Sequence, residues 1–201
     1  MTETTAGVAA SKSKIGDPDI SCGPPVPGAE IKIDEQVPGG GDGMGEVLDR
    51  GPNIMRGYFR NPDETANVLQ DGWLRTGDLG KIDTRGHLHI LGRSKELIIH
   101  GGFNVYPPEV EAALNDHPGV VQAAVVGRAV VGNEEVLAFC QVPPDSELTE
   151  DILKTYVRGK LAGYKRPSRI ILAYQLPAAT TGKILKHKLI DTFAAELASN
   201  L

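Results

Sequence analysis

The chain has 201 residues, a net charge of −5 and a hydrophobic fraction of 40%. This length allows one ordinary domain or two small ones, and the apolar content is sufficient for a buried core. The acidic balance gives no broad basic surface for nucleic acid, and no stretch approaches the roughly 20 apolar residues of a membrane span. The first five residues do not form a secretory signal. Cys22 and Cys140 have no metal-ligand spacing, so we expect reduced thiols in a cytoplasmic protein.

The first part of the chain predicts a loop followed by a mostly β region. Residues 1–28 are rich in Ser, Gly, Pro and Thr, a composition typical of loops. Pro62 begins a short predicted helix that continues to Leu69, with Asp63 and Glu64 near its positive end. Alternating apolar and polar residues or short apolar runs predict strands over residues 29–33, 45–48, 79–82, 88–91 and 97–99.

The second part of the chain changes to a mixed pattern. Helical periodicity predicts helices over residues 107–114, 149–161 and 185–197, with Thr149 as an N-cap. Apolar, mostly β-branched runs predict strands over residues 120–126, 136–142 and 170–172. The predicted fold class is therefore α+β. Residues 96–201 would form a small sheet packed by helices, residues 1–92 would form an incomplete β-rich domain, and residues 93–95 would join them.

One candidate for ligand binding is Asp78, which lies in the run Trp73–Gly80. An Asp beside a Gly and after a Thr can be presented in a tight turn, where its carboxylate could accept hydrogen bonds from two vicinal hydroxyls, as on a ribose. The alternative is that Asp78 merely closes the turn, which Asp often does.

Two later runs also carry candidate ligand-binding groups. Arg93 can supply forked donors to hydroxyl or phosphate oxygens, and Gly101 and Gly102 allow a ligand to approach the backbone closely. The alternative is a surface arginine and a β-turn. Lys183 follows Thr-Gly, and its ammonium could swing onto a phosphate or carboxylate oxygen, although a lone Thr-Gly-Lys is common. The spacing excludes a P-loop.

Together and in this order, several runs resemble the signature motifs of the AMP-forming acyl-CoA synthetases, which are relatives of luciferases and of adenylation domains in non-ribosomal peptide synthesis. These runs are residues 45–65, 73–80, 92–111, 161–167 and 176–186. Met1–Thr4 resembles the family's motif in which Thr-Glu follows Tyr-Gly or Gly-Met. The resemblance extends from about Gly23 to Leu189. The family's phosphate loop and most of its acyl pocket would lie upstream, so we expect a C-terminal fragment.

This resemblance implies an acid–CoA ligase. Such enzymes join a carboxylic acid to ATP, forming an acyl-adenylate, and CoA then displaces AMP to give a thioester. The resemblance implies ATP or AMP, magnesium and CoA as cofactors. Magnesium and cationic side chains would offset the negative charge on phosphate oxygens. The acid is not specified, and acetate, medium-chain, malonyl-like and aromatic acids all stay open. Alternatives are an adenylation module that loads a carrier protein and a non-catalytic nucleotide- or CoA-binding module.

The resemblance also implies roles for residues of the nucleotide site. Asp78 would bind the ribose hydroxyls with the assistance of Arg93. Thr2 would contact the adenylate phosphate, and Glu3 would help to hold magnesium.

Further roles implied by the resemblance fall on residues of the lid, the C-terminal domain that moves between the two half-reactions. Lys183 would be the catalytic lysine of adenylation. Lys95, at a position where the family often has Asp, would be the hinge residue. Gly101 and Gly102 would bind CoA as part of the pantetheine tunnel.

Other conspicuous side chains have more ordinary interpretations. We expect Tyr106 and Glu109 to hold the lid together and Trp73 to lie in a core. His87 and His89 would share one face of a strand and could begin a metal site, but no third ligand is near in sequence, which favours a solvated hairpin face.

Two properties of the isolated chain follow. Without the upstream residues it should have little or no ligase activity. Residues 1–92 should be poorly ordered or prone to association through the seam left by the rest of their domain.

Overall fold

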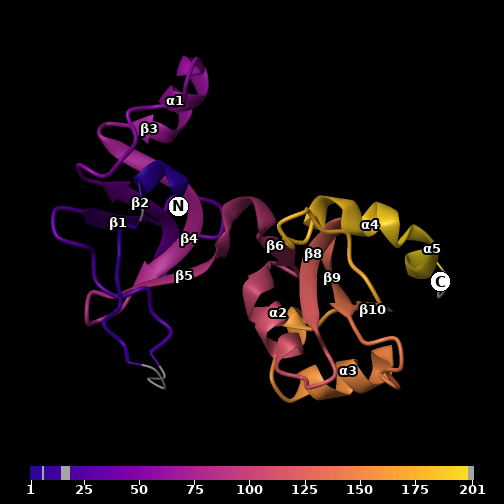
Figure 1. The fold of residues 1–201 in the computed structure, drawn as a ribbon. Helices are drawn as coiled ribbons and strands as arrows, with labels where there is room; N and C mark the ends of the chain where they lie inside the picture. Colours follow the sequence, from indigo (N-terminus) through magenta and orange to yellow (C-terminus); the bar gives the residue numbers. More distant parts are fainter. Residues whose placement is uncertain (6, 15–18, 199–201) are drawn as a thin grey trace. The chain divides into compact units, whose positions relative to one another are not determined.

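The computed structural model describes residues 1–5, 7–14 and 19–198. The chain divides into two compact units, Met1–Lys95 and Glu96–Leu201 (Figure 1). Secondary structure is mixed α and β, which confirms the predicted α+β class. Within the described residues, no helix combines the length and apolar character that a membrane crossing requires.

The first unit is built on one antiparallel five-stranded sheet. β4 is its long central strand, with β2 along one edge and β1 beyond β2. The other edge of β4 is shared by β3 at its beginning and β5 at its end. The strands are β1 (Glu30–Asp34), β2 (Met44–Arg50), β3 (Leu69–Gln70), β4 (Trp73–Ile82) and β5 (Leu88–Arg93).

Helix α1 (Pro62–Val68) begins as the sequence predicts. Pro62 occupies its first turn, and the side chain of Asn61 accepts a hydrogen bond from the Glu64 amide at 3.2 Å. Both features satisfy or remove amide donors that a helix start leaves unpaired.

Two expectations for the first unit are wrong. Asp78 does not lie in a tight turn but inside β4, opposite Arg93 of β5. Gly77, with φ of 71°, bends the strand there, so the Thr-Gly-Asp signal marks a kink rather than a turn. Trp73 is only half-buried and does not lie in the core, and the cationic side chains of Lys32 and Arg50 lie over its ring at 4.3 and 4.4 Å. The predicted loop over residues 1–28 is confirmed for the residues described there, apart from the short 3-10 helix Thr2–Thr4.

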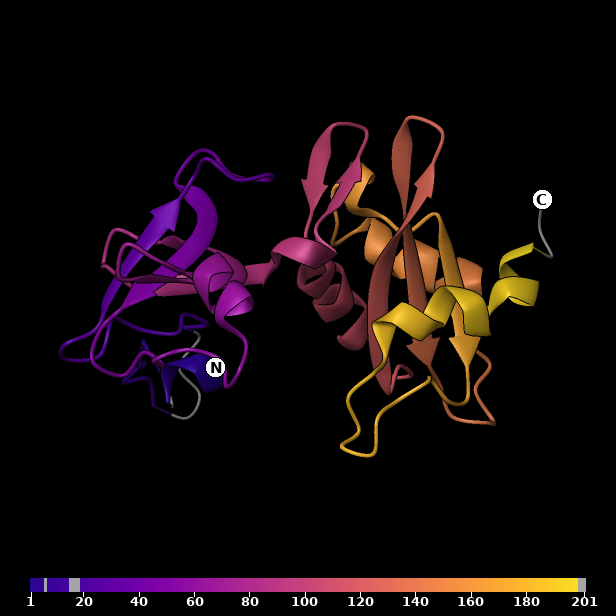
Figure 2. The ribbon, with the colours of Figure 1, turned by 90° about the horizontal axis from the view of Figure 1, so that it is seen from above.

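The second unit contains a three-stranded sheet in the order β10-β9-β8 and a separate two-stranded hairpin, β6-β7. β8 and β9 are antiparallel, and β10 runs parallel to β9. Figure 2 shows the β6-β7 and β8-β9 hairpins extending in the same direction. The strands are β6 (Ile98–His100), β7 (Phe103–Val105), β8 (Gln122–Val130), β9 (Asn133–Gln141) and β10 (Arg169–Ala173). The helices are α2 (Pro107–Asn115), α3 (Glu150–Arg158), α4 (Leu189–Thr192) and α5 (Ala194–Ala198).

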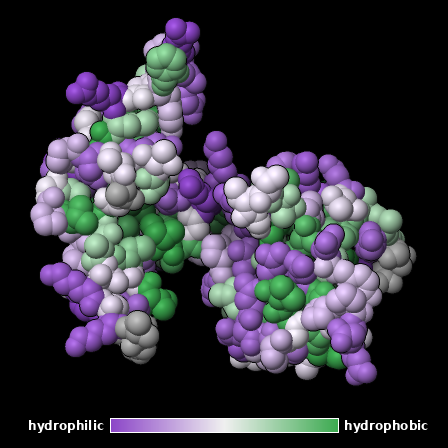
Figure 3. Space-filling model, in the orientation of Figure 1, coloured by the Kyte–Doolittle hydropathy of each residue, from purple (hydrophilic) through white to green (hydrophobic). Residues whose placement is uncertain are grey.

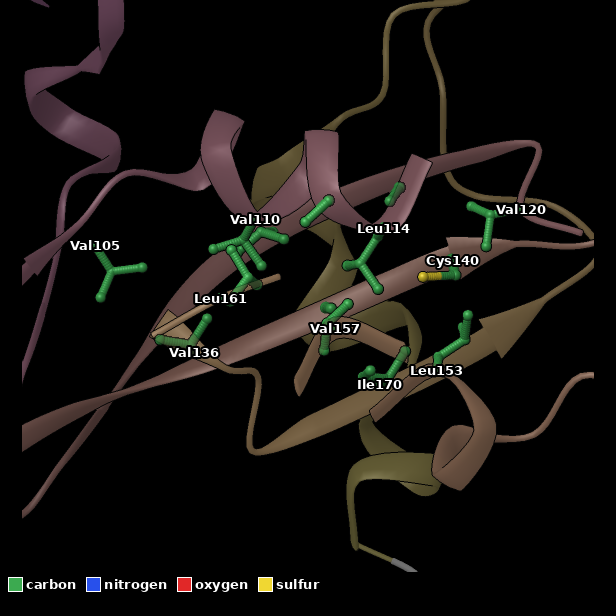
Figure 4. Packing of buried hydrophobic residues seen from close by; sticks show 14 of the residues in the cluster. Val105, Val110, Leu114, Val120, Val136, Cys140, Leu153, Val157, Leu161 and Ile170 are labelled. Atoms are coloured by element: carbon green, nitrogen blue, oxygen red, sulfur yellow. The ribbon is translucent and has the colours of Figure 1, made fainter. Parts of the chain in front are cut away.

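Both faces of the three-stranded sheet are covered by apolar side chains. Alternate residues of a strand point to opposite faces, so Val136, Ala138 and Cys140 enter one core while Leu137 and Phe139 enter the other. The first core includes side chains of α2 and α3 (Figure 4). The second includes the buried residues Leu189, Phe193 and Leu197 near the C-terminal end.

The second unit confirms most of its predicted elements. The Thr149 hydroxyl accepts a hydrogen bond from the Ile152 amide at 3.3 Å, as expected for an N-cap. The predicted continuous helix over residues 185–197 is wrong. A 3-10 turn (Lys186–Lys188), α4 and α5 replace it, with a break at Phe193, whose ring packs on Phe139 at a centroid distance of 5.5 Å. The helix is therefore interrupted at the residue whose ring packs in the core, although the local sequence has helical periodicity.

Candidate functional site

An acid–base pair lies at the end of the first unit's sheet. Asp78 and Arg93 are paired residues of β4 and β5, and Arg93 Nε lies 2.8 Å from Asp78 Oδ1. Arg93 Nη1 also donates to the Thr76 carbonyl at 3.3 Å. Burial raises the pKa of the Asp78 carboxyl, and the Arg93 guanidinium opposes that rise. One carboxylate oxygen is thus held by Arg93, and Oδ2 can accept donors from a ligand.

Local hydrogen bonds fix the backbone beside this pair. The Thr76 hydroxyl donates to the Val47 carbonyl at 2.7 Å and accepts from the Asp78 amide at 3.0 Å. The Gly77 amide donates to Glu46 Oε1 at 3.0 Å. These bonds hold the kink of β4 in place, so that Asp78 is positioned by the strands rather than by a mobile turn.

A second carboxyl group adjoins the same region. Asp49 of β2 is only 1% exposed and lines a cavity of about 200 Å³ with Thr76 and Asp78. Its Oδ1 has no hydrogen-bond partner among the described residues. Burial raises the pKa of the Asp49 carboxyl to about 6, and the charge of Asp78 adds to this rise.

The N-terminal residues implied for phosphate and magnesium lie in the same unit. Glu3 Oε1 accepts a hydrogen bond from the Tyr58 hydroxyl at 3.1 Å, and the Met55 amide donates to the Glu3 carbonyl at 2.8 Å. The Glu3 carboxylate contributes to the raised pKa of Asp78, which indicates electrostatic proximity. Thr2 begins the 3-10 turn that carries Glu3.

The carboxylate groups present are compatible with the way in which nucleotide-binding sites hold magnesium. No group of three possible protein ligands exists among the described residues. Magnesium in such sites is bound by one or two carboxylates together with phosphate oxygens and water. Glu3 could supply one such carboxylate, since the Tyr58 hydroxyl donates only to its Oε1.

The two candidate CoA-contacting glycines form the turn between β6 and β7. Gly101 and Gly102 have φ of 59° and 82°, which side chains rarely adopt, and no atom lies within 4 Å of a Cβ placed at either position. The Gly101 amide donates to Asn133 Oδ1 at 2.7 Å. Next to this turn, the rings of Phe103 and Tyr164 stack at 4.6 Å. The turn is therefore held by β9 and open to a ligand.

Lys183 lies in an exposed loop after β10. The Ala179 amide donates to the Lys183 carbonyl at 2.8 Å, and the Gly182 amide donates to the Ala179 carbonyl at 2.9 Å. In the described part of the chain, no carboxylate forms an ion pair with the Lys183 ammonium. The loop thus presents a cation on a turn closed by backbone hydrogen bonds.

Other predicted residues have structural partners. Lys95 is exposed in the 3-10 turn Ser94–Glu96 and is the last residue of the first unit. Glu109 pairs with Lys165 at 2.6 Å across the second unit. His89 Nε2 lies 3.1 Å from Asp83 Oδ2, in a hairpin network without a third metal ligand among the residues described.

Two parts of the chain match known families. Residues 109–183 match the family described as AMP-binding enzyme C-terminal domain, and residues 1–59 match the family described as AMP-binding enzyme. The chain belongs to the AMP-binding enzyme family. The matched regions place the C-terminal domain of this family in the second unit.

Curated members of the AMP-binding enzyme family are similar to the chain over part of their length. The long-chain-fatty-acid–CoA ligase of Escherichia coli O6:H1 is 41% identical over 175 residues, which are 85% of this chain and 31% of that protein. A feruloyl-CoA synthase from an Amycolatopsis species is 38% identical over 192 residues, 92% of this chain and 39% of that protein. The chain therefore spans about a third of the length of these relatives.

A solved structure of the family has the same fold. It is o-succinylbenzoate coenzyme A synthetase from Bacillus subtilis in complex with ATP and magnesium ion. The TM-score is 0.84 and the identity 34%, over 94% of this chain and 40% of that chain.

Sequence reasoning missed two features of this family member. Asp49 follows Val47 and Leu48 in β2 and lies on the same face as Val47, and an acid at an inward-facing strand position was the available signal. Lys186 pairs with Glu96 and Glu111, residues so distant in sequence that no local pattern connects them.

Proposed function

We propose that the chain is the C-terminal part of an AMP-forming carboxylate–CoA ligase, and that Asp78 with Arg93 binds the nucleotide ribose. The observation that carries this proposal is the pair itself, held at 2.8 Å on two adjacent strands beside a fixed kink. Arg93 pairs with Asp78 Oδ1, and the carboxylate has further acceptor capacity on Oδ2 for a ribose hydroxyl. A carboxylate that is already oriented loses little conformational freedom when the ligand binds.

The same unit would supply the groups for phosphate and metal. Thr2 would contact the phosphate and Glu3 would hold magnesium, and the hydrogen bond from the Tyr58 hydroxyl to Glu3 Oε1 orients that carboxylate. Magnesium, when bound, would offset the negative charge on phosphate oxygens. The contribution of the chain is to fix the carboxylate before the ion arrives.

The second unit would act as the lid. Lys183 brings its ammonium to the carboxylate and phosphate oxygens during adenylation, and no carboxylate of the described residues forms an ion pair with this charge. Residues 93–95 form the hinge, with Lys95 exposed at the division between the units. Gly101 and Gly102 offer the open backbone along which the pantetheine of CoA passes.

Nucleotide binding can be tested on the chain as it stands. We expect AMP, added to the 15N-labelled protein, to shift the amide resonances of Asp78 and Arg93. Asp78→Ala should remove these shifts, whereas Asp63→Ala, at an exposed position of α1, should retain them. Absence of any shift at both residues with millimolar AMP would refute the ribose assignment.

Ligase activity requires the upstream residues. We expect a fusion of this chain to the preceding part of the E. coli relative to catalyse acid-dependent exchange of pyrophosphate into ATP, and then thioester formation with CoA. The 201-residue chain alone should do neither. ATP- and CoA-dependent thioester formation by the isolated chain would contradict this division. Thioester formation on a carrier protein but not on CoA would favour the carrier-loading module, and binding without catalysis in the fusion would favour a binding module.

Exposed apolar side chains motivate a prediction of self-association. Hydrophobic atoms are visible at the surface (Figure 3), and Phe59 in the first unit is 87% exposed. We expect light scattering to detect association that weakens in Phe59→Ser. Val131→Ser removes a fully exposed side chain of the second unit and should leave the association unchanged. A monomer at all concentrations would contradict the prediction.

A further inference from the structure

A lysine near the candidate catalytic loop is held by two carboxylates. Lys186 Nζ lies 2.6 Å from Glu96 Oε2 and 2.8 Å from Glu111 Oε1. The lysine side chain is 26% exposed and that of Glu111 is 18% exposed. Ion pairs at a protein surface contribute little, but a partly buried lysine between two acids is screened less by water.

Each carboxylate attaches Lys186 to a different element. Glu111 belongs to α2, and its Oε1 also accepts a hydrogen bond from the Val125 amide of β8 at 2.8 Å. Glu96 is the first residue of the second unit and directly follows Lys95. Lys186 therefore joins the sheet and its packed helix to the residue after the candidate hinge.

Lys186 also closes the base of the Lys183 loop. It lies three residues after Lys183, and the Leu185 amide before it donates to the Pro177 carbonyl at 2.8 Å. Ala178 and Ile184 form a β-bridge within the same loop. The path from Lys183 to the ion pairs is thus a short segment with backbone hydrogen bonds, and motion at its base would displace the Lys183 ammonium.

The charge of Lys186 persists despite its surroundings. Burial lowers the pKa of its ammonium, but the carboxylates of Glu111 and Glu96 raise the pKa more, so the net shift is upward. The Lys186 ammonium is therefore protonated throughout the neutral pH range, and a change of pH within that range does not break its ion pairs.

We propose that Lys186 is a positioning residue that, through Glu96 and Glu111, fixes the Lys183 loop to the residue following the hinge. Movement about the hinge would then carry Lys183 and the sheet as one body. The functional part of this inference rests on the proposed ligase function, whereas its structural part does not.

The structural part is tested by hydrogen exchange in the 201-residue chain. Lys186→Met keeps the apolar stem and removes the charge. We expect exchange of the Ala179, Gly182 and Leu185 amides to rise by about tenfold or more, with little change in the β9 amides. Lys186→Arg should restore most of the protection. Lys188→Met is the matched control, because Lys188 is exposed in the same 3-10 turn.

A double-mutant cycle identifies the partner. Glu96→Gln should raise exchange in the loop by itself but add little in the Lys186→Met background, because the same ion pair is already absent. Equal exchange in Lys186→Met and Lys188→Met would overturn the inference. So would an increase spread equally over the loop and β9, which would mean that Lys186 only stabilises the unit as a whole.

The functional part is tested in the active fusion. Lys186→Met should lower the rate of adenylation by roughly tenfold, with KM for ATP and the rate of thioester formation from supplied acyl-adenylate nearly unchanged. Equal losses in both half-reactions would refute the positioning role. A fusion without any adenylation would instead refute the proposed function, while the exchange experiment would still decide the structural part.

Discussion

The interiors of the two units differ in kind. In the described residues, every buried polar or charged side chain belongs to the first unit: Thr4, Ser21, Glu46, Asp49 and Thr76. The buried apolar side chains of that unit are few, namely Val47, Leu48, Leu74, Leu79 and Leu88. The second unit buries many more, in two cores on opposite faces of one sheet.

This difference indicates a division of tasks. Most buried polar groups are hydrogen-bonded, and such bonds fix local geometry while adding little net stability. The first unit uses them to hold the strand kink beside Asp78. The second unit has a stable apolar interior, suited to carrying Lys183 and the glycine turn as a rigid body.

The largest expected effect comes from a cavity in the second unit. Leu137→Ala, at a fully buried position, should lower the free energy of unfolding of that unit by about 2–5 kcal/mol. The single tryptophan, Trp73, lies in the first unit, so its fluorescence reports that unit separately while far-UV circular dichroism follows both.

If the two interiors are independent, Leu137→Ala shifts the dichroism transition but leaves the Trp73 transition in place. Leu79→Ala, the matched change in the first unit, should do the reverse. Coincident shifts of both probes in either variant would break the comparison, because the units would then unfold as one.

The next effect concerns the proposed catalytic cation. In the active fusion, Lys183→Ala should lower the rate of adenylation by roughly 100-fold, since it removes one charge that stabilises the transition state. Thioester formation from supplied acyl-adenylate should change far less. Lys188→Ala is the control. Equal loss in the two half-reactions would contradict the role of Lys183.

The stability of the first unit should depend on pH, because its interior contains the carboxyl group of Asp49. The folded-state pKa of Asp49, about 6, lies above its ordinary value of 3.8, so the folded state binds this proton more tightly. The resulting stabilisation is present below about pH 4 and is lost as the pH rises through 6. The charges facing Asp49 are the Asp78 carboxylate, which raises the pKa, and the Met1 amino group, which lowers it.

Asp49→Asn cannot ionise and should therefore be more stable than the parent at pH 8 by about 1–3 kcal/mol. The advantage should shrink towards pH 4. Urea unfolding followed by Trp73 fluorescence between pH 4 and 8 measures this. A difference independent of pH would show that Asp49 is not the titrating group.

The smallest effect should come from a surface ion pair of the second unit. Glu109→Gln removes the pair with Lys165, and the Glu109 side chain is 44% exposed. We expect a loss of about 0.2–1 kcal/mol in urea unfolding. Glu147→Gln, at an exposed position, should have no effect. If Glu109→Gln lowered the free energy of unfolding as much as Leu137→Ala, apolar packing would not be the main source of stability in the second unit.

The sequence predicted what depends on local pattern. The strands of the second unit and the Thr149 cap follow from periodicity and capping chemistry, and the structure confirms them. The position of Asp78 was predicted wrongly, because Thr-Gly-Asp suits a turn and a kinked strand equally well and only pairing with β5 decides between them. The broken C-terminal helix depends on where Phe193 finds room against Phe139.

The candidate site was predictable only in part. Asp78, Arg93 and Lys183 stand within recognisable motifs, and their roles stay predictions until ligands are tested. The cavity that Asp49 lines is formed by several segments that are far apart in sequence, from the N-terminal residues to β5. The ion pair of Lys186 with Glu96 joins residues 90 positions apart. Contacts of this kind depend on the tertiary fold and cannot be predicted from a local sequence pattern.

The arrangement of β9 has a consequence for biosynthesis. Its antiparallel partner β8 is joined to it by a tight turn, so this hairpin can close as soon as both strands leave the ribosome. Its parallel partner β10 follows only after α3. Until Arg169–Ala173 is synthesised, one edge of β9 has no partner from its own chain, and the nascent protein is most open to wrong strand pairing during that interval.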